Sequence, residues 1–294
     1  MYDLTTILQF LVSGLGAGCI YGLVAIGFAV IFNASGIVNF AQGAFVMLGG
    51  MVTAVFYQNI HLPLAIAAVL AVVLTAFLGA AFQLLIISPL QHRRTAVFIM
   101  MLATLALSIV VENTVLHAIG DQPLSFPSFT PGEPFRLGSV VIDRQIVWMV
   151  AGSLLLVITL QLVYSFTLFG KAMKACAIIS EVASLLAIPV RKMTTYSFAL
   201  SAALGAIGGV LITPTQYTAY YITVPFSVSG FVAAVIGGLG NPLGAFVGGV
   251  MLGVLQSFAV LFFPSGYKDI LAFSLLLVFL FFRPAGLFRS LVED

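Results

Sequence analysis

Few side chains in this sequence could do chemistry, and they are widely separated. An enzyme needs a nucleophile beside a base, or a cluster of metal ligands. The three histidines, His61, His92 and His117, fall near the ends of apolar runs without companion ligands. Cys19 and Cys176 lie in different segments, so we expect neither a disulfide between them nor a metal site. We therefore predict a protein that is not an enzyme.

Amide side chains occur in two places where glycine and asparagine interrupt the apolar pattern. The first interruption, residues 33–43, contains Asn39 and Gln42, and the second interruption, residues 237–244, contains Asn241. Irregular backbone at membrane depth is tolerated only where protein buries it or where it lines a cavity, and paired breaks in a transporter indicate a translocation path. The alternative is an ordinary turn between two spans. We predict that these three amides line a solute path.

Glu112 is the only acidic residue well inside an apolar run, and Asn113 lies beside it. An ionisable group within a membrane span is by default a functional hypothesis, which adds Glu112 to the predicted path. Its place near the outer end of the run leaves a second interpretation, in which the carboxylate reaches the membrane interface and has no role in transport.

The composition indicates a membrane protein with several spans. Of the 294 residues, 62% are hydrophobic and 7% are charged, whereas about 25% are charged in a soluble domain. The net charge of +2 arises from 11 basic and 9 acidic residues, which supports neither a nucleic-acid partner nor a polybasic surface. We therefore expect membrane lipid to surround most of this chain.

The apolar runs predict an all-α, polytopic transmembrane bundle of about eight or nine spans with interrupted helices. If the N-terminus is outside and residues 226–239 cross the membrane, eight of the 11 basic residues fall on the cytoplasmic side. That count favours nine crossings. The predicted apolar runs are residues 7–32, 44–57, 63–87, 96–117, 146–166, 194–213, 226–236, 243–263 and 269–282.

Glycine recurs at every fourth position in the first apolar run, at Gly14, Gly18 and Gly22. Such a stripe of small residues lets another helix approach closely in lipid, where packing drives helix association. We predict a helix contact at this stripe in preference to a role in lining a pore.

A more polar segment lies between the fifth and sixth apolar runs. Residues 172–188 carry apolar side chains at helical spacing, and the cations on both sides of the segment favour a cytoplasmic position. A short helix between two spans can receive the motion of a partner and transmit it to those spans. The alternative is a membrane-surface helix without a partner. The residues that we expect to carry the contact are Lys174, Ala175, Cys176, Glu181, Ser184 and Leu185.

Four stretches of the chain together resemble a known family. They are GCIYGLVAIGFAVIF at residues 18–32, GIVNFAQG at 36–43, KACAIISEVASLLAI at 174–188 and GGLGNPLGAFVGG at 237–249. In this combination they resemble the permease of a branched-chain amino acid ABC transporter, the LivH type, from end to end. The resemblance implies one transmembrane permease domain over residues 1–294, a bacterial inner-membrane location, a related LivM-type permease, two cytoplasmic ATPase subunits that contact residues 174–188, and a periplasmic solute-binding protein.

The sequence has no phosphate-binding loop of the form G-x-x-x-x-G-K-[ST], so we expect no cofactor in this chain and ATP bound by partner subunits. It departs from the family pattern at Ile178 and Ile179, where acidic residues are frequent, at Gln42, where histidine is common, and at Ala44, where an acidic residue is common. These departures leave urea or short amides open as solutes. A gradient-driven carrier is a weaker alternative, because it would normally place several carboxylates or histidines in mid-span.

Overall fold

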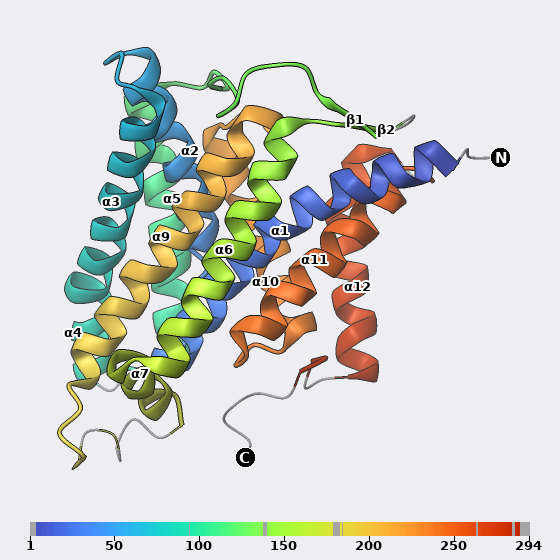
Figure 1. The fold of residues 1–294 in the computed structure, drawn as a ribbon. Helices are drawn as coiled ribbons and strands as arrows, with labels where there is room; N and C mark the ends of the chain where they lie inside the picture. Colours follow the sequence, from blue (N-terminus) through green and yellow to red (C-terminus); the bar gives the residue numbers. More distant parts are fainter. Residues whose placement is uncertain are drawn as a thin grey trace.

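Long apolar runs become long helices here, because lipid offers no partner to backbone N–H and C=O groups. The computed structural model describes residues 4–288 apart from residues 94, 138–139, 179–182, 184, 263 and 284–285. Figure 1 shows the resulting helical bundle. Its main helices are α1 (Leu4–Ser35), α2 (Gln42–Gln58), α3 (Leu64–Phe82), α4 (Ser88–His92), α5 (Val97–Ile119), α6 (Arg144–Phe166), α7 (Leu168–Ile178), α9 (Val190–Gln216), α10 (Thr223–Gly237), α11 (Pro242–Ala259) and α12 (Lys268–Phe282).

Short elements join these helices. A π-helical turn, η1 (Gln83–Ile87), connects α3 to α4, and two 3-10 turns, η2 (Tyr220–Ile222) and η3 (Ser265–Tyr267), precede α10 and α12. The connection between α5 and α6 contains an antiparallel hairpin of β1 (Phe135–Leu137) and β2 (Val140–Ile142). In Figure 1 this hairpin lies at one end of the bundle and α7 lies at the other.

The prediction of an all-α, polytopic membrane bundle is confirmed. Among the described residues, seven helices are long and apolar enough to cross a membrane. The helix α2 has 17 residues and α12 has 15, fewer than the roughly 20 that a full crossing uses. The total of eight or nine crossings therefore stays a prediction.

The helix α1 runs obliquely through the middle of the bundle, and its glycine stripe faces α11. A Cβ built at Gly18 would lie 2.8 Å from Cα of Val250, and one at Gly253 would lie 2.2 Å from Cα of Gly18. A side chain on either glycine would push the two backbones apart. The predicted close helix contact is confirmed.

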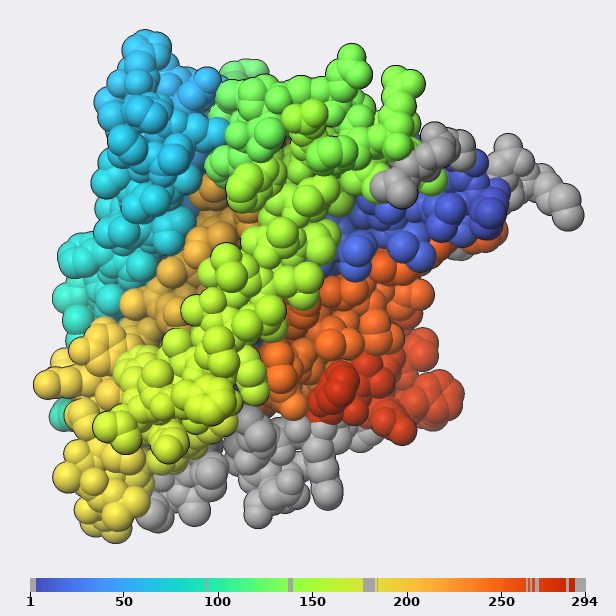
Figure 2. All heavy atoms as spheres, viewed as in Figure 1, coloured from blue at the N-terminus to red at the C-terminus, as the bar shows by residue number. Residues whose placement is uncertain are grey.

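The peripheral helices present apolar side chains outward. Phe77 on α3 is 69% exposed, and Val69 and Leu155 are similarly uncovered on α3 and α6. In Figure 2, α6 lies across the visible face, and only the N-terminal part of α1 reaches the surface there. Such outer faces suit lipid, while α1, α9 and α10 form the packed interior.

The predicted helix over residues 172–188 has different bounds. The helix α7 begins earlier, at Leu168, and among the residues that follow it residues 186–189 are not helical. Ala187 has a φ of +59°, which is a left-handed conformation that interrupts a right-handed helix. The earlier start reflects a close turn: a Cβ at Gly170 would meet backbone atoms of Val163 and Tyr164, so only glycine lets α7 fold back against the end of α6.

Candidate functional site

The first interruption carries three fully buried side chains into the bundle. Residues 36–41 are not helical, and the side chains of Ile37, Asn39 and Gln42 have no exposed surface. The helix α2 starts directly after this segment, at Gln42. At Ile37 and Asn39 the irregular backbone is thus surrounded by protein and not by lipid.

Side chains from two other helices pair the backbone of Phe40 and Gly43 in this segment. The amide N–H of Phe40 donates to the hydroxyl of Thr104 on α5 at 3.0 Å. The hydroxyl of Ser227 on α10 accepts from the N–H of Gly43 at 2.9 Å and donates to the carbonyl oxygen of Phe40 at 3.0 Å. At these two residues the bundle therefore replaces hydrogen bonds that a continuous helix would have made, whereas Ser35 and Asn39 pair other N–H groups from within the segment.

Gln42 joins three helices at one point. Its Nε2 donates to the carbonyl oxygen of Ser201 on α9 at 3.0 Å. The Ser201 hydroxyl lies 2.7 Å from Oε1 of Gln42 and 2.9 Å from the carbonyl oxygen of Gly27 on α1, and its one proton serves either acceptor. A Cβ at Gly27 would occupy the place of the Gln42 amide. Gln42 is therefore a fixed part of the interior.

Asn39 differs from Gln42 because only part of its amide is used. Its Oδ1 accepts from the N–H of Ala41 at 3.2 Å, while its Nδ2 is buried without a hydrogen-bond partner among the described residues. A buried donor without a partner costs about 1–3 kcal/mol. Asn39 thus retains hydrogen-bonding capacity inside the bundle.

The second interruption is a short turn that touches the first. Residues 238–241 separate α10 from α11, and Oδ1 of Asn241 accepts from the N–H groups of Leu243 and Gly244, both at 3.1 Å. This is an N-cap, which pairs backbone donors that a helix start leaves open. Asn33, at the start of the first interruption, donates through Nδ2 to the carbonyl oxygen of Gly240 at 3.0 Å. The structure thus brings the two predicted breaks together.

Glu112 lies away from this junction. It is half-buried on α5, eight residues beyond Thr104, which is about 12 Å along a helix axis. The structure therefore does not place Glu112 with Asn39, Gln42 and Asn241, and its part in a path stays a prediction.

The predicted contact helix is described only in part. Lys174 and Ala175 are partly exposed on α7, while Cys176 is 4% exposed. Burial raises the pKa of the Cys176 thiol above its ordinary value, which makes this cysteine a packing residue and a poor nucleophile. Leu185 is 85% exposed. Glu181 and Ser184 lie outside the described residues.

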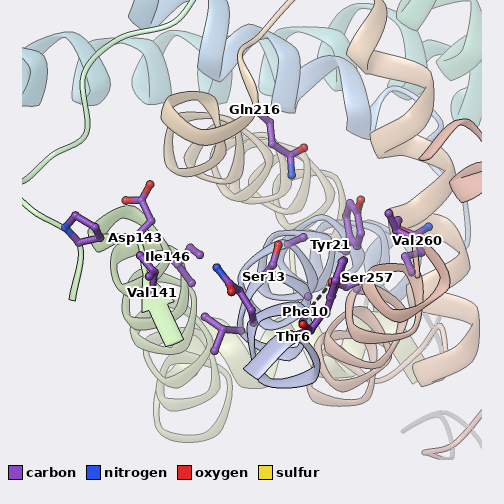
Figure 3. Close-up of a pocket in the computed structure, with 17 residues that line it drawn as sticks. Thr6, Phe10, Ser13, Tyr21, Val141, Asp143, Ile146, Gln216, Ser257 and Val260 are labelled. Atoms are coloured by element: carbon purple, nitrogen blue, oxygen red, sulfur yellow. Dashed lines mark hydrogen bonds between the residues drawn. The ribbon is translucent and has the colours of Figure 1, made fainter. Parts of the chain in front are cut away.

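A large cavity lies at the hairpin end of the bundle, and sequence reasoning did not find it. This outer cavity measures about 610 Å³ and lies between α1, the start of α6, the end of α9 and α11. Figure 3 shows Ser13, Tyr21, Asp143, Gln216 and Ser257 around it. Val12, Ile146 and Val260 provide apolar walls, and Gln256, 3% exposed, adds a buried amide. Gln9 and Gln256, which line the cavity and lie inside apolar runs, were the signal in the sequence that could have indicated it.

Comparisons with known proteins agree with this architecture. Residues 10–280 match the family described as "Branched-chain amino acid transport system / permease component". The permease protein BraD of Pseudomonas aeruginosa, from a high-affinity branched-chain amino acid transport system, is 30% identical and the match covers 95% of each chain. The LivH permease protein of Escherichia coli is 29% identical over 95% of this chain and 94% of its own length.

A solved structure supports the fold alone. PsaBC from Streptococcus pneumoniae, in complex with Fab, superposes with a TM-score of 0.52 at 15% identity, over 94% of this chain and 93% of the other.

Proposed function

Because the chain belongs to the family of branched-chain amino acid transport permeases, we propose that it forms the membrane-spanning path of an ATP-driven importer for a branched-chain or similar apolar amino acid. The match over residues 10–280 is the observation that carries this proposal. It covers most of the lining of the outer cavity, the junction of both interruptions and α7.

The outer cavity has the chemistry that such a solute needs. A free amino acid is a zwitterion with an apolar side chain, and a cavity with amides, hydroxyls and the Asp143 carboxylate between apolar walls can hold it weakly. Weak binding suits transport, since tight binding within the membrane would slow release. Capture can be left to an external binding protein. We propose that the solute enters here and passes the junction where Nδ2 of Asn39 has no hydrogen-bond partner among the described residues.

The partners follow from the same family. We propose that the chain works in a bacterial inner membrane as one transmembrane permease unit beside a related LivM-type permease, with two ATPases at the α7 end and a solute-binding protein at the hairpin end. The turn at Gly170 holds α7 directly against α6. A displacement of α7 by an ATPase would therefore move α6 as well.

Reconstitution tests the proposal. The permease is assembled in lipid vesicles with the ATPases, related permease and binding protein encoded beside it, and uptake of labelled leucine is measured. We expect uptake that requires ATP, and no ATP hydrolysis by the purified chain alone. Uptake driven by a proton or sodium gradient without any ATPase would contradict the proposal.

Cross-linking tests the docking of α7. Leu185→Cys places a thiol on an exposed position just beyond α7, and Ile60→Cys places a control thiol on the exposed connection between α2 and α3. We expect the first variant, and not the second, to link to an ATPase in the assembled complex. A Leu185→Cys thiol that reacts with aqueous reagents but links to no ATPase would contradict docking here.

A further inference from the structure

A small cavity connects α7 to the second interruption. This inner cavity measures about 140 Å³ and lies between α1, α6, α7 and the start of α11. Tyr164 lines it, is 5% exposed, and its hydroxyl has no hydrogen-bond partner among the described residues. Because buried hydroxyl groups are ordinarily paired, this site is incomplete without an occupant.

The polar lining of the inner cavity is suited to an anionic group. Lys174 contributes an ammonium group on a flexible stem, which donates and cannot accept hydrogen bonds. Gln161 is exposed at the mouth. The oxygen of Asn241 faces the N–H groups that it caps, which leaves its NH₂ end as the donor. Among the described residues that line the cavity, none is acidic.

The remaining walls are apolar and close together. Ile26, Val157 and Leu160 face the cavity from α1 and α6. Its volume of about 140 Å³ is close to that of an apolar cavity of roughly 150 Å³ that accepts benzene. A ligand that fits this lining has a carboxylate and a small, branched apolar body, and the amide oxygen of Gln161 and the hydroxyl oxygen of Tyr164 are acceptors for an ammonium group beside the carboxylate.

We propose that the inner cavity binds the transported amino acid on the α7 side of the bundle, with its carboxylate toward Lys174 and Tyr164 and its side chain against Ile26 and Val157. This inference rests on the proposed function and adds a second site to it. Because Lys174 belongs to α7, a shift of α7 changes the donors that face the carboxylate. Occupancy of the site and the position of α7 are thereby linked.

Photolabelling tests the site directly. The assembled complex, in zwitterionic lipid and without ATP or binding protein, is exposed to a leucine analogue that carries a diazirine in its side chain. We expect label on Ile26 or on residues 157–160, removed by excess leucine. Leucinamide lacks the carboxylate and should compete about tenfold more weakly. Equal competition by leucinamide, or label displaced by anionic lipid and not by leucine, would overturn the proposal.

Matched variants distinguish the loss of this binding site from a general loss of folding. Tyr164→Phe removes only the unpartnered hydroxyl, and Lys174→Gln removes the charge; each should reduce labelling about threefold or more. Lys171→Gln changes an exposed cation on the same helix that does not line the cavity, and should leave labelling unchanged. Unchanged labelling in both test variants would overturn the site.

The experiments can contradict the inner site and the proposed function separately. Absence of label in a wild-type complex that still imports leucine with ATP would overturn the inner site and leave the importer standing. A wild-type complex that imports no amino acid would overturn the importer itself.

Discussion

The two interruptions have the same residue types but different structures. In the first, the six non-helical residues include the fully buried Ile37 and Asn39, and Thr104 and Ser227 from other helices pair the backbone of Phe40. In the second, four residues make a turn that Asn241 caps from within. Glycine with asparagine therefore predicts where a helix stops. It does not predict whether the break is held locally or by the whole bundle.

This difference decides how far a perturbation spreads. The first interruption depends on α5, α9 and α10, so a change there disturbs several helices. The second depends on its own cap, on one bond from Asn33 and on the N–H of Phe288, which donates to the carbonyl oxygen of Gly237 at 3.2 Å. We expect substitutions at the first interruption to cost more stability than comparable ones at the second.

Gly43→Ala should give the largest effect. A Cβ at Gly43 would lie 1.9 Å from the carbonyl oxygen of Thr223, which is backbone and cannot rotate away. We expect a loss of about 3 kcal/mol or more in the free energy of unfolding, measured by denaturant titration in micelles. Gly266→Ala, where nothing lies within 4 Å, is the control and should be neutral. Equal stability of the two variants would contradict the close packing at the first interruption.

Ser227→Ala should give the next effect. It leaves the N–H of Gly43 and the carbonyl oxygen of Phe40 without their shared partner, at a cost of about 2 kcal/mol. Ser274→Ala serves as the control, since Ser274 is exposed and donates only to its own helix. If both substitutions cost the same, Ser227 does not support the first interruption.

The sequence was sufficient for the membrane class, the bundle and the two interruptions, because hydropathy and glycine spacing are local features of the chain. The contact at Gly14, Gly18 and Gly22 followed from spacing alone. Contacts between residues from distant parts of the chain were harder to predict. Nothing local indicates that Gln42 meets Ser201, 159 residues away, since that pairing depends on how α2 and α9 pack.

Two features could not be predicted from the sequence, because they depend on contacts between helices. The start of α7 at Leu168 depends on the contact of Gly170 with the end of α6. The outer cavity depends on the crossing of α1 and α11, which no single segment encodes. Its glutamines, Gln216 and Gln256, were visible in the sequence but were not adjacent.

Asn39→Leu tests whether the first interruption serves transport as well as structure. Leucine has a similar volume and removes an Nδ2 that has no partner among the described residues. It also leaves the N–H of Ala41 without its acceptor, at a cost of about 1–3 kcal/mol, so we expect assembly to persist while leucine uptake falls about tenfold. Asn113→Leu, at an exposed amide on α5, is the control and should transport normally. Normal uptake by Asn39→Leu would make the first interruption a purely structural break.

Asn241 gives the smallest and most discriminating test, because one side chain has two separable roles. Asn241→Ala removes the cap and should cost about 1 kcal/mol in the free energy of unfolding, whereas Asn241→Ser supplies another capping oxygen and should restore most of it. The serine hydroxyl is shorter than the amide and carries no NH₂ group toward the inner cavity. We therefore expect Asn241→Ser to unfold near the wild-type midpoint and yet import leucine about twofold more slowly. If uptake recovers together with stability, Asn241 acts only as a helix cap, and the second interruption is a turn outside the solute path.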